Sequence, residues 1–132
     1  MTMGRSGLYK NTYGARRNKL NNSKVIYGKQ TFDSKKELQR YLQLKQLENE
    51  GRIRCLERQA KYELIPAIRI DGKVVERACN YIADFRYIDR VKGEVVVEDV
   101  KGYRNPNSAT YAKYVIKRKL MLHIYGIRIS EV

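Results

Sequence analysis

The sequence predicts one α/β domain in which a helix, a three-stranded antiparallel meander, a second helix and a last strand follow one another. Two segments have apolar residues at helical spacing, and the stretch between them changes to strand-like runs separated by turn residues. The length of 132 residues is usual for one domain. A hydrophobic content of 42% is enough for a packed core.

A capping box predicts the start of the first helix. Ser34 and Glu37 are three positions apart, the spacing at which the hydroxyl group and the carboxylate cap each other's backbone. Apolar residues then recur at helical spacing until Gly51, and these are Leu38, Tyr41, Leu42 and Leu47. The first helix is therefore expected near residues 34–50.

Strand signals begin near residue 60 and continue through a hairpin. Asp71 and Gly72 separate two apolar runs and are typical of a two-residue hairpin turn. Further strands are expected over residues 81–88 and 94–101, with a cluster of turn residues between them. The second of these contains three consecutive valines, which favours a buried strand.

A second helix is expected after a polar loop. Its apolar stripe consists of Tyr111, Tyr114, Val115, Met121, Leu122 and Tyr125. Gly126 can end this helix in a left-handed cap, and residues 127–130 are then expected to form the last strand.

The chain is strongly basic, with 28 Lys and Arg against 14 Asp and Glu and a formal net charge of +14. The first 32 positions contain no acidic residue. We therefore expect residues 1–24 to form a flexible basic arm and residues 25–132 to form the folded domain. Because no apolar run approaches the ~20 residues that cross a bilayer, and no signal segment is seen, a cytoplasmic protein without membrane contact is expected.

A polyanion is the partner that this charge predicts, and several residues are candidates for contact with DNA. Lys113 and Lys117 share one side of the second helix, where they form either a solvated stripe or phosphate contacts. The amide of Gln59 could equally bind a phosphate or hold a backbone turn. The complete set of candidates is Arg16, Arg17, Lys19, Lys24, Gln59, Arg104, Lys113 and Lys117.

Two acids and a lysine fall near the ends of two neighbouring predicted strands. Antiparallel pairing can bring Asp84 beside Asp99. Because side chains alternate along a strand, Lys101 shares the face of Asp99, whereas Glu98 points to the other face. Glu98 is thus a second choice as a metal ligand, and its alternative role is a salt bridge to an arginine.

Two converging carboxylates favour a bound divalent cation, because without one their mutual repulsion would push them toward the neutral acid. Mg²⁺ is the fitting ion, being commonly held by one or two carboxylates together with water and substrate phosphate. It would polarise a scissile phosphate, while Lys101 could orient the attacking water and offset negative charge. The alternative is an ordinary strand pair with a surface ion pair.

This set of residues resembles the motif of the PD-(D/E)xK nuclease superfamily, with Asp84, a spacer and then Asp99-Val-Lys101. The sequence departs from the family pattern at Ala83, where the name-giving proline would stand, and at Asp99, which replaces the commoner glutamate. The resemblance extends over about residues 25–132, and the segments that carry it are 32–37, 56–59, 81–85, 97–102 and 117–120.

This resemblance implies a restriction-endonuclease-like core of helix, three-stranded meander, helix and strand. It also implies that Asp84 and Asp99 bind metal, that Lys101 is the catalytic lysine and that Glu37 is an additional acidic ligand in the catalytic set. Since the capping box already accounts for Glu37, both roles stay open for that residue.

The sequence is most similar to small phage-encoded endonucleases of this superfamily that are catalogued as a domain of unknown function. The resemblance implies a Mg²⁺-dependent endonuclease, with Mn²⁺ as a possible substitute, that resolves four-way Holliday junctions in the host cytoplasm. Symmetric cleavage of a junction requires two active sites, so a homodimer is expected. Alternatives are a non-catalytic basic nucleic-acid-binding module and a sequence-specific or nicking phage endonuclease.

Overall fold

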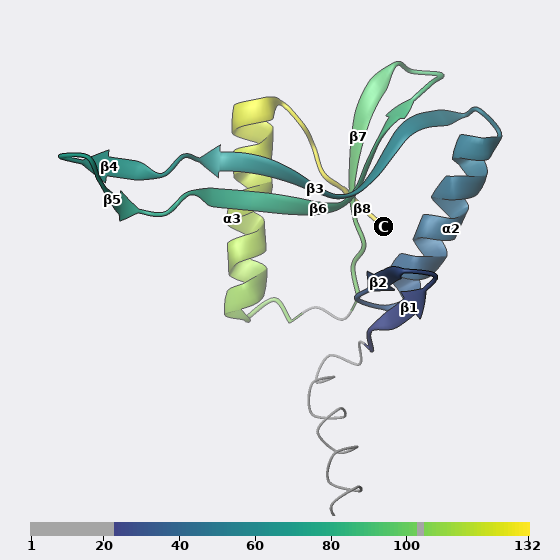
Figure 1. The fold of residues 1–132 in the computed structure, drawn as a ribbon, viewed down its shortest axis with the longest axis horizontal. Helices are drawn as coiled ribbons and strands as arrows, with labels where there is room; N and C mark the ends of the chain where they lie inside the picture. Colours follow the sequence, from purple (N-terminus) through teal and green to yellow (C-terminus); the bar gives the residue numbers. More distant parts are fainter. Residues whose placement is uncertain (1–22, 103–104) are drawn as a thin grey trace, which may run out of the picture.

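The computed structural model describes residues 23–102 and 105–132, so that the predictions for Arg16, Arg17, Lys19 and Arg104 lie outside the described residues. Within these ranges the fold is mixed α/β, with two helices, one four-stranded sheet and two small hairpins (Figure 1). The elements are β1 (Val25–Tyr27), β2 (Gln30–Phe32), α2 (Lys35–Asn49), β3 (Ile53–Ile65), β4 (Ile68–Ile70), β5 (Lys73–Glu76), β6 (Cys79–Asp89), β7 (Glu94–Asp99), α3 (Ala109–Tyr125) and β8 (Ser130–Glu131).

Both predicted helices are confirmed, α2 with the predicted Ser34 cap and α3 with the predicted Gly126 cap. The Ser34 hydroxyl accepts a hydrogen bond from the backbone N–H of Glu37 at the start of α2. Ser108 caps α3 in the same way, and Gly126 ends that helix with a φ of 68°. In the described ranges, no helix has the length and apolar character needed to cross a membrane.

The main sheet has the strand order β3-β6-β7-β8, in which β8 runs parallel to β7 and the other pairs are antiparallel. The predicted strands over 81–88 and 94–101 correspond to β6 and β7, but β7 ends at Asp99, so that Lys101 lies just beyond the strand. Asp71 and Gly72 have φ angles of 52° and 77° and form the two-residue turn between β4 and β5.

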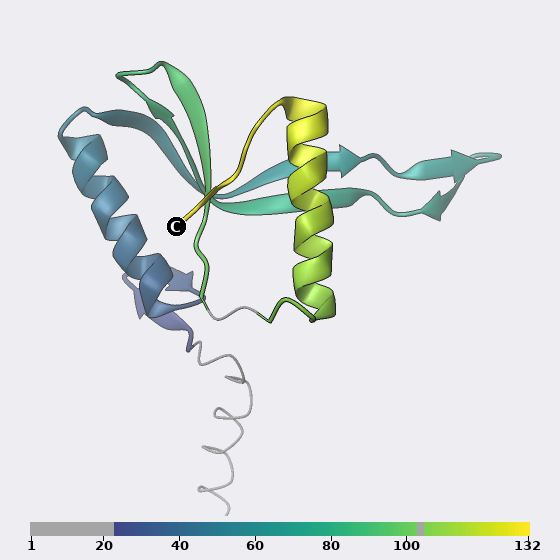
Figure 2. The same ribbon diagram turned by 180° about the vertical axis from the view of Figure 1, so that it is seen from behind.

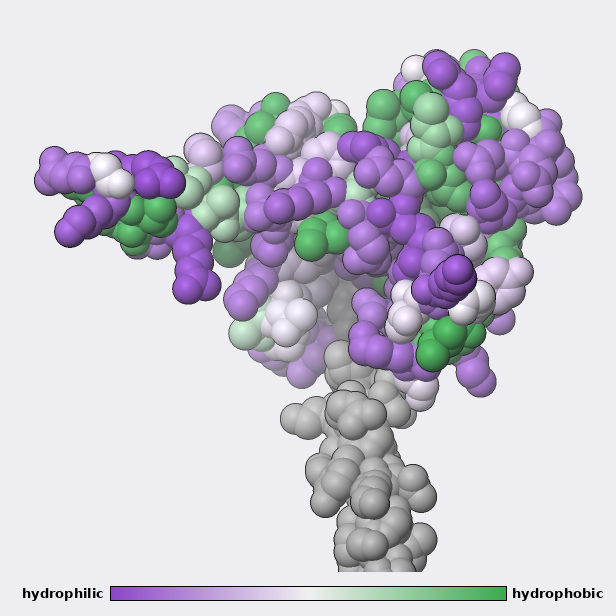
Figure 3. All heavy atoms as spheres, in the orientation of Figure 1, coloured by the Kyte–Doolittle hydropathy of each residue, from purple (hydrophilic) through white to green (hydrophobic). Residues whose placement is uncertain are grey.

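The hairpin of β4 and β5 extends away from the rest of the molecule beyond the outer ends of β3 and β6 (Figure 1). It carries exposed apolar residues beside charged ones, and its green and purple surface stands apart from the body in Figure 3. The exposed apolar residues of the hairpin are Ile68, Ile70, Val74 and Val75.

The strands differ from the prediction in three further respects. A hairpin of β1 and β2 precedes α2, and β3 begins at Ile53 rather than near residue 60. The last strand is β8, Ser130–Glu131, and does not span residues 127–130. The physical reason is that Ile129 is buried in the core under α3 and Ile127 packs against it, so only the last residues lie alongside β7.

Alternate residues of one strand, which normally share a face of the sheet, here pack against different helices. Ala83 of β6 packs in the cluster under α3, whereas Phe85, two residues later, packs in the cluster under α2. On β3, Ala60 likewise lies under α3, while Arg58 contacts α2. The sheet therefore changes the helix that it faces at Asp84, and Figure 2 shows the two helices on either side of the strand crossing.

Candidate active site

The carboxyl groups of Asp84 and Asp99 meet where β6 and β7 end. Phe85 pairs with Glu98, so Asp84 lies across from Asp99. The Oδ2 atom of Asp84 accepts a hydrogen bond of 2.8 Å from the backbone N–H of Val100, which follows Asp99. The strand that carries one acid therefore fixes the orientation of the other.

Burial, hydrogen bonding to Asp99 and the negative charge of Asp99 together raise the pKa of Asp84 to about 8, while the N–H of Val100 acts in the opposite direction. At neutral pH and without a cation, Asp84 therefore keeps a proton that an exposed aspartate would have lost. Asp99 instead forms an ion pair with Lys101. The pair of acids thus carries less negative charge than two free carboxylates.

Lys101 is held from several sides. Its ammonium group contacts the Oδ2 atom of Asp99 and lies 3.3 Å from the centre of the Tyr114 ring. Its backbone N–H donates to the carbonyl oxygen of Val132 at 2.9 Å, and the N–H of Val132 donates to the carbonyl oxygen of Asp99 at 3.0 Å. Backbone pairing with the C-terminal segment therefore positions Asp99, at the end of β7, and Lys101, just beyond it.

The hydroxyl group of Tyr81 is a buried polar group near the acids. It has no hydrogen-bond partner within the described ranges. Burial raises the pKa of Tyr81, and the nearby charges of Asp99 and Asp84 act in the same direction. Such an unpaired buried hydroxyl is costly, and it is available to donate a hydrogen bond to a group bound at the acids.

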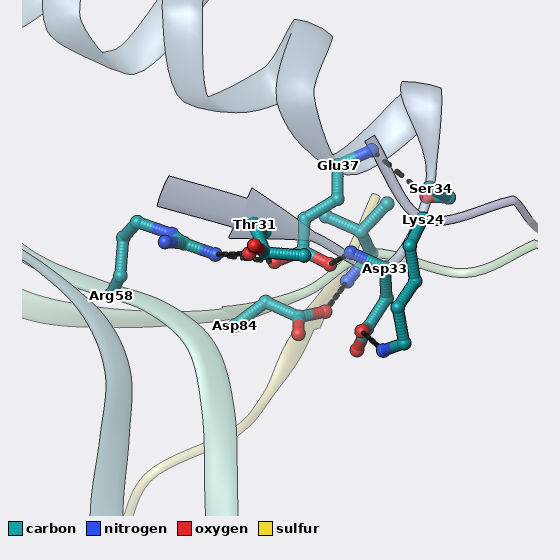
Figure 4. Close-up of polar contacts among 8 residues, drawn as sticks. Lys24, Thr31, Asp33, Ser34, Glu37, Arg58 and Asp84 are labelled. Atoms are coloured by element: carbon teal, nitrogen blue, oxygen red, sulfur yellow. Dashed lines mark hydrogen bonds and ion pairs between the residues drawn. The ribbon is translucent and has the colours of Figure 1, made fainter. Parts of the chain in front are cut away.

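Glu37 is a third acid near Asp84, and its negative charge also raises the pKa of Asp84. Only 3% of the surface of Glu37 is exposed. Figure 4 shows its carboxylate between Arg58 and the backbone of Asp33, with Asp84 below it. Its Oε1 accepts from the N–H of Asp33 at 3.3 Å, and its Oε2 accepts from Arg58 at 3.4 Å. Burial raises the pKa of Glu37, and these donors partly oppose that shift.

Glu98 faces away from Lys101 and is engaged in a buried cluster. Arg40 of α2 donates two hydrogen bonds to its carboxylate, at 2.8 and 2.6 Å, and the hydroxyl of Tyr87 donates a third at 2.5 Å. Only 2% of Glu98 is exposed. Glu98 therefore forms a salt bridge to an arginine, which is the alternative role predicted for it from the sequence.

The donor set at the acids fits a hard divalent cation. Asp84 and Asp99 supply carboxylate oxygens, which Mg²⁺ prefers and which it commonly takes in ones or twos together with water and phosphate. Across the residues that the structure describes, no group of three or more His, Cys, Asp or Glu could hold a metal ion. Glu37 is therefore not brought into a three-acid site and contributes charge near the pair.

Gln59 lies beside this site on β3. Because Arg58 pairs with Phe85 and Ala60 pairs with Ala83, Gln59 lies across from Asp84. Its φ of 54° places a non-glycine residue in the left-handed region, where strain of about 1–3 kcal/mol is typical and functional sites are common. The side chain is exposed.

The remaining DNA-contact candidates in the described ranges are Lys24, which precedes β1, and Lys113 and Lys117 on α3. Lys24 forms an exposed ion pair with Asp33 at 2.9 Å. Lys113 is exposed on α3, and Lys117 is partly exposed on the next turn of that helix. The N-terminal region of α2 adds one cation that was not among the candidates, since Lys36 donates to the backbone carbonyl of Lys101.

Sequence reasoning missed three parts of this site. Tyr114 and Tyr81 occur in apolar patterns and were interpretable only as core residues, although each directs its polar or aromatic group at the acids and lysine. The paired strand end at Val132 has no sequence signal of its own.

Comparison with the curated proteins and with the solved structures found no significant match. A protein-family profile described as "Protein of unknown function (DUF1064)" matches residues 17–128. The match includes the acid pair, Lys101 and all of α3. Since it covers most of the 132 residues, the chain belongs to the DUF1064 family.

Proposed function

We propose that this protein is a Mg²⁺-dependent DNA endonuclease that hydrolyses phosphodiester bonds, with four-way junctions as its substrate and a homodimer as its active form. The observation that carries the proposal is the meeting of Asp84, Asp99 and Lys101 at one point of the sheet. The net charge of +14 supports a nucleic acid as the substrate.

Two acids whose charge is only partly offset are suited to a cation. Asp84 and Asp99 would hold Mg²⁺, which when bound supplies a Lewis acid for the scissile phosphate. Asp84 gives up its proton when it acts as a ligand, because a coordinating carboxylate must be ionised. Mn²⁺ has similar ligand preferences and is expected to substitute.

The side chains of the protein supply the rest of the chemistry. The ammonium of Lys101 offsets the negative charge that builds up on the phosphate and orients the attacking water. The Tyr114 ring and the ion pair with Asp99 hold that ammonium in place. The buried hydroxyl of Tyr81 is free to donate a hydrogen bond to an oxygen at the acid pair.

The decisive experiment uses the full chain with labelled linear duplex, flap and four-way junction DNA, with Mg²⁺ or EDTA. The proposal expects Mg²⁺-dependent cleavage of the junction, at least about 100-fold slower for Asp84→Asn. Lys101→Ala is expected to bind the junction normally but to lose cleavage. Cleavage that survives both EDTA and Asp84→Asn would contradict the proposal, as would binding without any cleavage, the behaviour of a basic binding module.

Comparison of the three DNA substrates separates the remaining possibilities. Preference for the junction supports a resolvase that acts on DNA in the cytoplasm, whereas site-specific cutting or nicking of linear duplex would indicate a sequence-specific enzyme. Light scattering of the purified chain tests the dimer. A monomer that cuts a junction on one strand only would contradict the symmetric arrangement.

A further inference from the structure

A pocket of about 620 Å³ lies between α3 and the segment that leads into β8. This segment runs from the end of α3 back to the centre of the sheet (Figure 2). Three of the residues that line the pocket are cationic: Arg118 and Lys119 on α3, and Arg128 on the segment before β8. The other lining residues are Leu122, Ile129 and Glu131.

The one carboxylate in the pocket is already engaged. Glu131 accepts a hydrogen bond of 2.6 Å from the hydroxyl of Tyr114 and one of 3.2 Å from Arg118. Lys119 and Arg128 form no ion pair with any residue in the described ranges, and both are exposed. The pocket therefore offers two uncompensated cations to an incoming anion.

Glu131 and Tyr114 connect the pocket with the acid pair. Glu131 of β8 pairs with Asp99 of β7, and Tyr114 binds Glu131 through its hydroxyl and Lys101 through its ring. Because phosphates recur about every 3.4 Å along the axis of one strand, a phosphodiester chain with one phosphate at the acids has further phosphates available to this neighbouring pocket.

We propose that the pocket lined by Arg118, Lys119 and Arg128 binds a backbone phosphate that flanks the scissile one. This inference rests on the proposed function, since it places DNA across the acid pair. The free charges of Lys119 and Arg128 suit a phosphate, and the acceptor of the pocket, Glu131, is already bound by Tyr114 and Arg118. The pocket thus fixes how the strand lies, and leaves sequence preference to other parts of the molecule.

The test measures binding of labelled junction and duplex DNA to the full chain by fluorescence anisotropy in EDTA, over a series of NaCl concentrations. Lys119→Ala and Arg128→Ala should each weaken binding about three- to tenfold at low salt and reduce the slope of log K against log salt by about 0.9. Lys92→Ala is the matched control, because Lys92 lies in the turn at the other end of β7. It should change neither quantity by a comparable amount.

Two outcomes overturn the inference: unchanged affinity and slope in both pocket variants, or an equal loss in Lys92→Ala. Should circular dichroism show that an alanine variant is unfolded, Arg128→Lys and Lys119→Arg keep the charge and should bind with normal affinity and slope, and a loss of binding in these folded variants would also overturn it. Because the assay measures binding in EDTA and involves no cleavage, its result can be interpreted even if the nuclease proposal fails. Conversely, a chain that cuts DNA but binds normally without these cations would refute the pocket alone.

Discussion

The Lys101 ammonium shows how single residues hold the site together. It lies between the Asp99 carboxylate and the face of the Tyr114 ring, 3.3 Å from the ring centre. A partly desolvated cation over an aromatic face gains about 2 kcal/mol, which is enough to select one rotamer of a flexible side chain. Tyr114 is therefore a positioning residue for Lys101.

Replacing the ring should lower turnover without weakening DNA binding. Tyr114→Leu is expected to reduce kcat about tenfold, because the loss of about 1–2 kcal/mol leaves Lys101 free to leave the acids. KM should change less than about twofold. Tyr114→Phe keeps the ring and serves as the control, and single-turnover kinetics measure both. Equal losses in the two variants would show that the hydroxyl bond to Glu131 matters instead.

The raised pKa of Asp84 predicts how stability changes with pH. The folded chain holds this proton up to about pH 8, whereas the unfolded chain releases it near 3.8. Its contribution to stability is therefore complete below about pH 4 and is lost as the pH rises to about 8, at no more than about 1.4 kcal/mol per unit. Denaturation of the metal-free chain by urea between pH 5 and 9 measures this slope.

The Asp84→Asn variant should lack that slope, and saturating Mg²⁺ should flatten it in the unaltered chain, because the ion replaces the proton. Parallel pH profiles for the variant and the unaltered chain would contradict the assignment of the proton to Asp84.

At the scale of the elements, Glu98 joins α2 to β7. Glu98→Ala is expected to lower the free energy of unfolding by about 3 kcal/mol, because it leaves Arg40 and Tyr87 without their buried acceptor. Glu94→Ala, an exposed acid on the same strand, should cost less than about 0.5 kcal/mol. Thermal denaturation measures both. A folded Glu98→Ala chain that no longer binds Mg²⁺ would make Glu98 a ligand instead.

The helices, β6, β7 and the β4–β5 turn could be predicted because their signals are local: caps, periodicity and turn residues that act within a few positions. The start of β3 could not, since its alternation is broken by a register shift after Arg54 and by positive φ angles at Cys55 and Gln59. The change of helix at Asp84 has no signature either, because it depends on how the whole sheet twists.

The candidate site likewise has a part that local sequence patterns predict and a part that depends on tertiary packing. The shared face of Asp99 and Lys101 follows from strand alternation, and the structure places both there. The engagement of Glu37 by Arg58 and of Glu98 by Arg40 depends on residues 21 and 58 positions away. Contacts of that range come from packing, which a local pattern does not contain.

At the scale of the whole molecule, charge outside the sheet is expected to dominate affinity for DNA. Residues 1–22 contain five cations and no acid: Arg5, Lys10, Arg16, Arg17 and Lys19. Their removal should weaken DNA binding and lower the salt slope by up to about 4, while Mg²⁺ binding stays unchanged. Salt titrations of the truncated chain test this, and an unaltered slope would show that these residues do not contact phosphates.

The hydrogen bond from the Val100 amide to Asp84 gives the site its own spectroscopic reporter. Since the chain is only 15.5 kDa, this amide should be resolvable by NMR in an isotopically labelled sample. Its chemical shift and its solvent-exchange rate should respond when a cation or a proton arrives at Asp84, before any DNA is added. Occupancy of the acids can therefore be followed at one nitrogen in the resting protein.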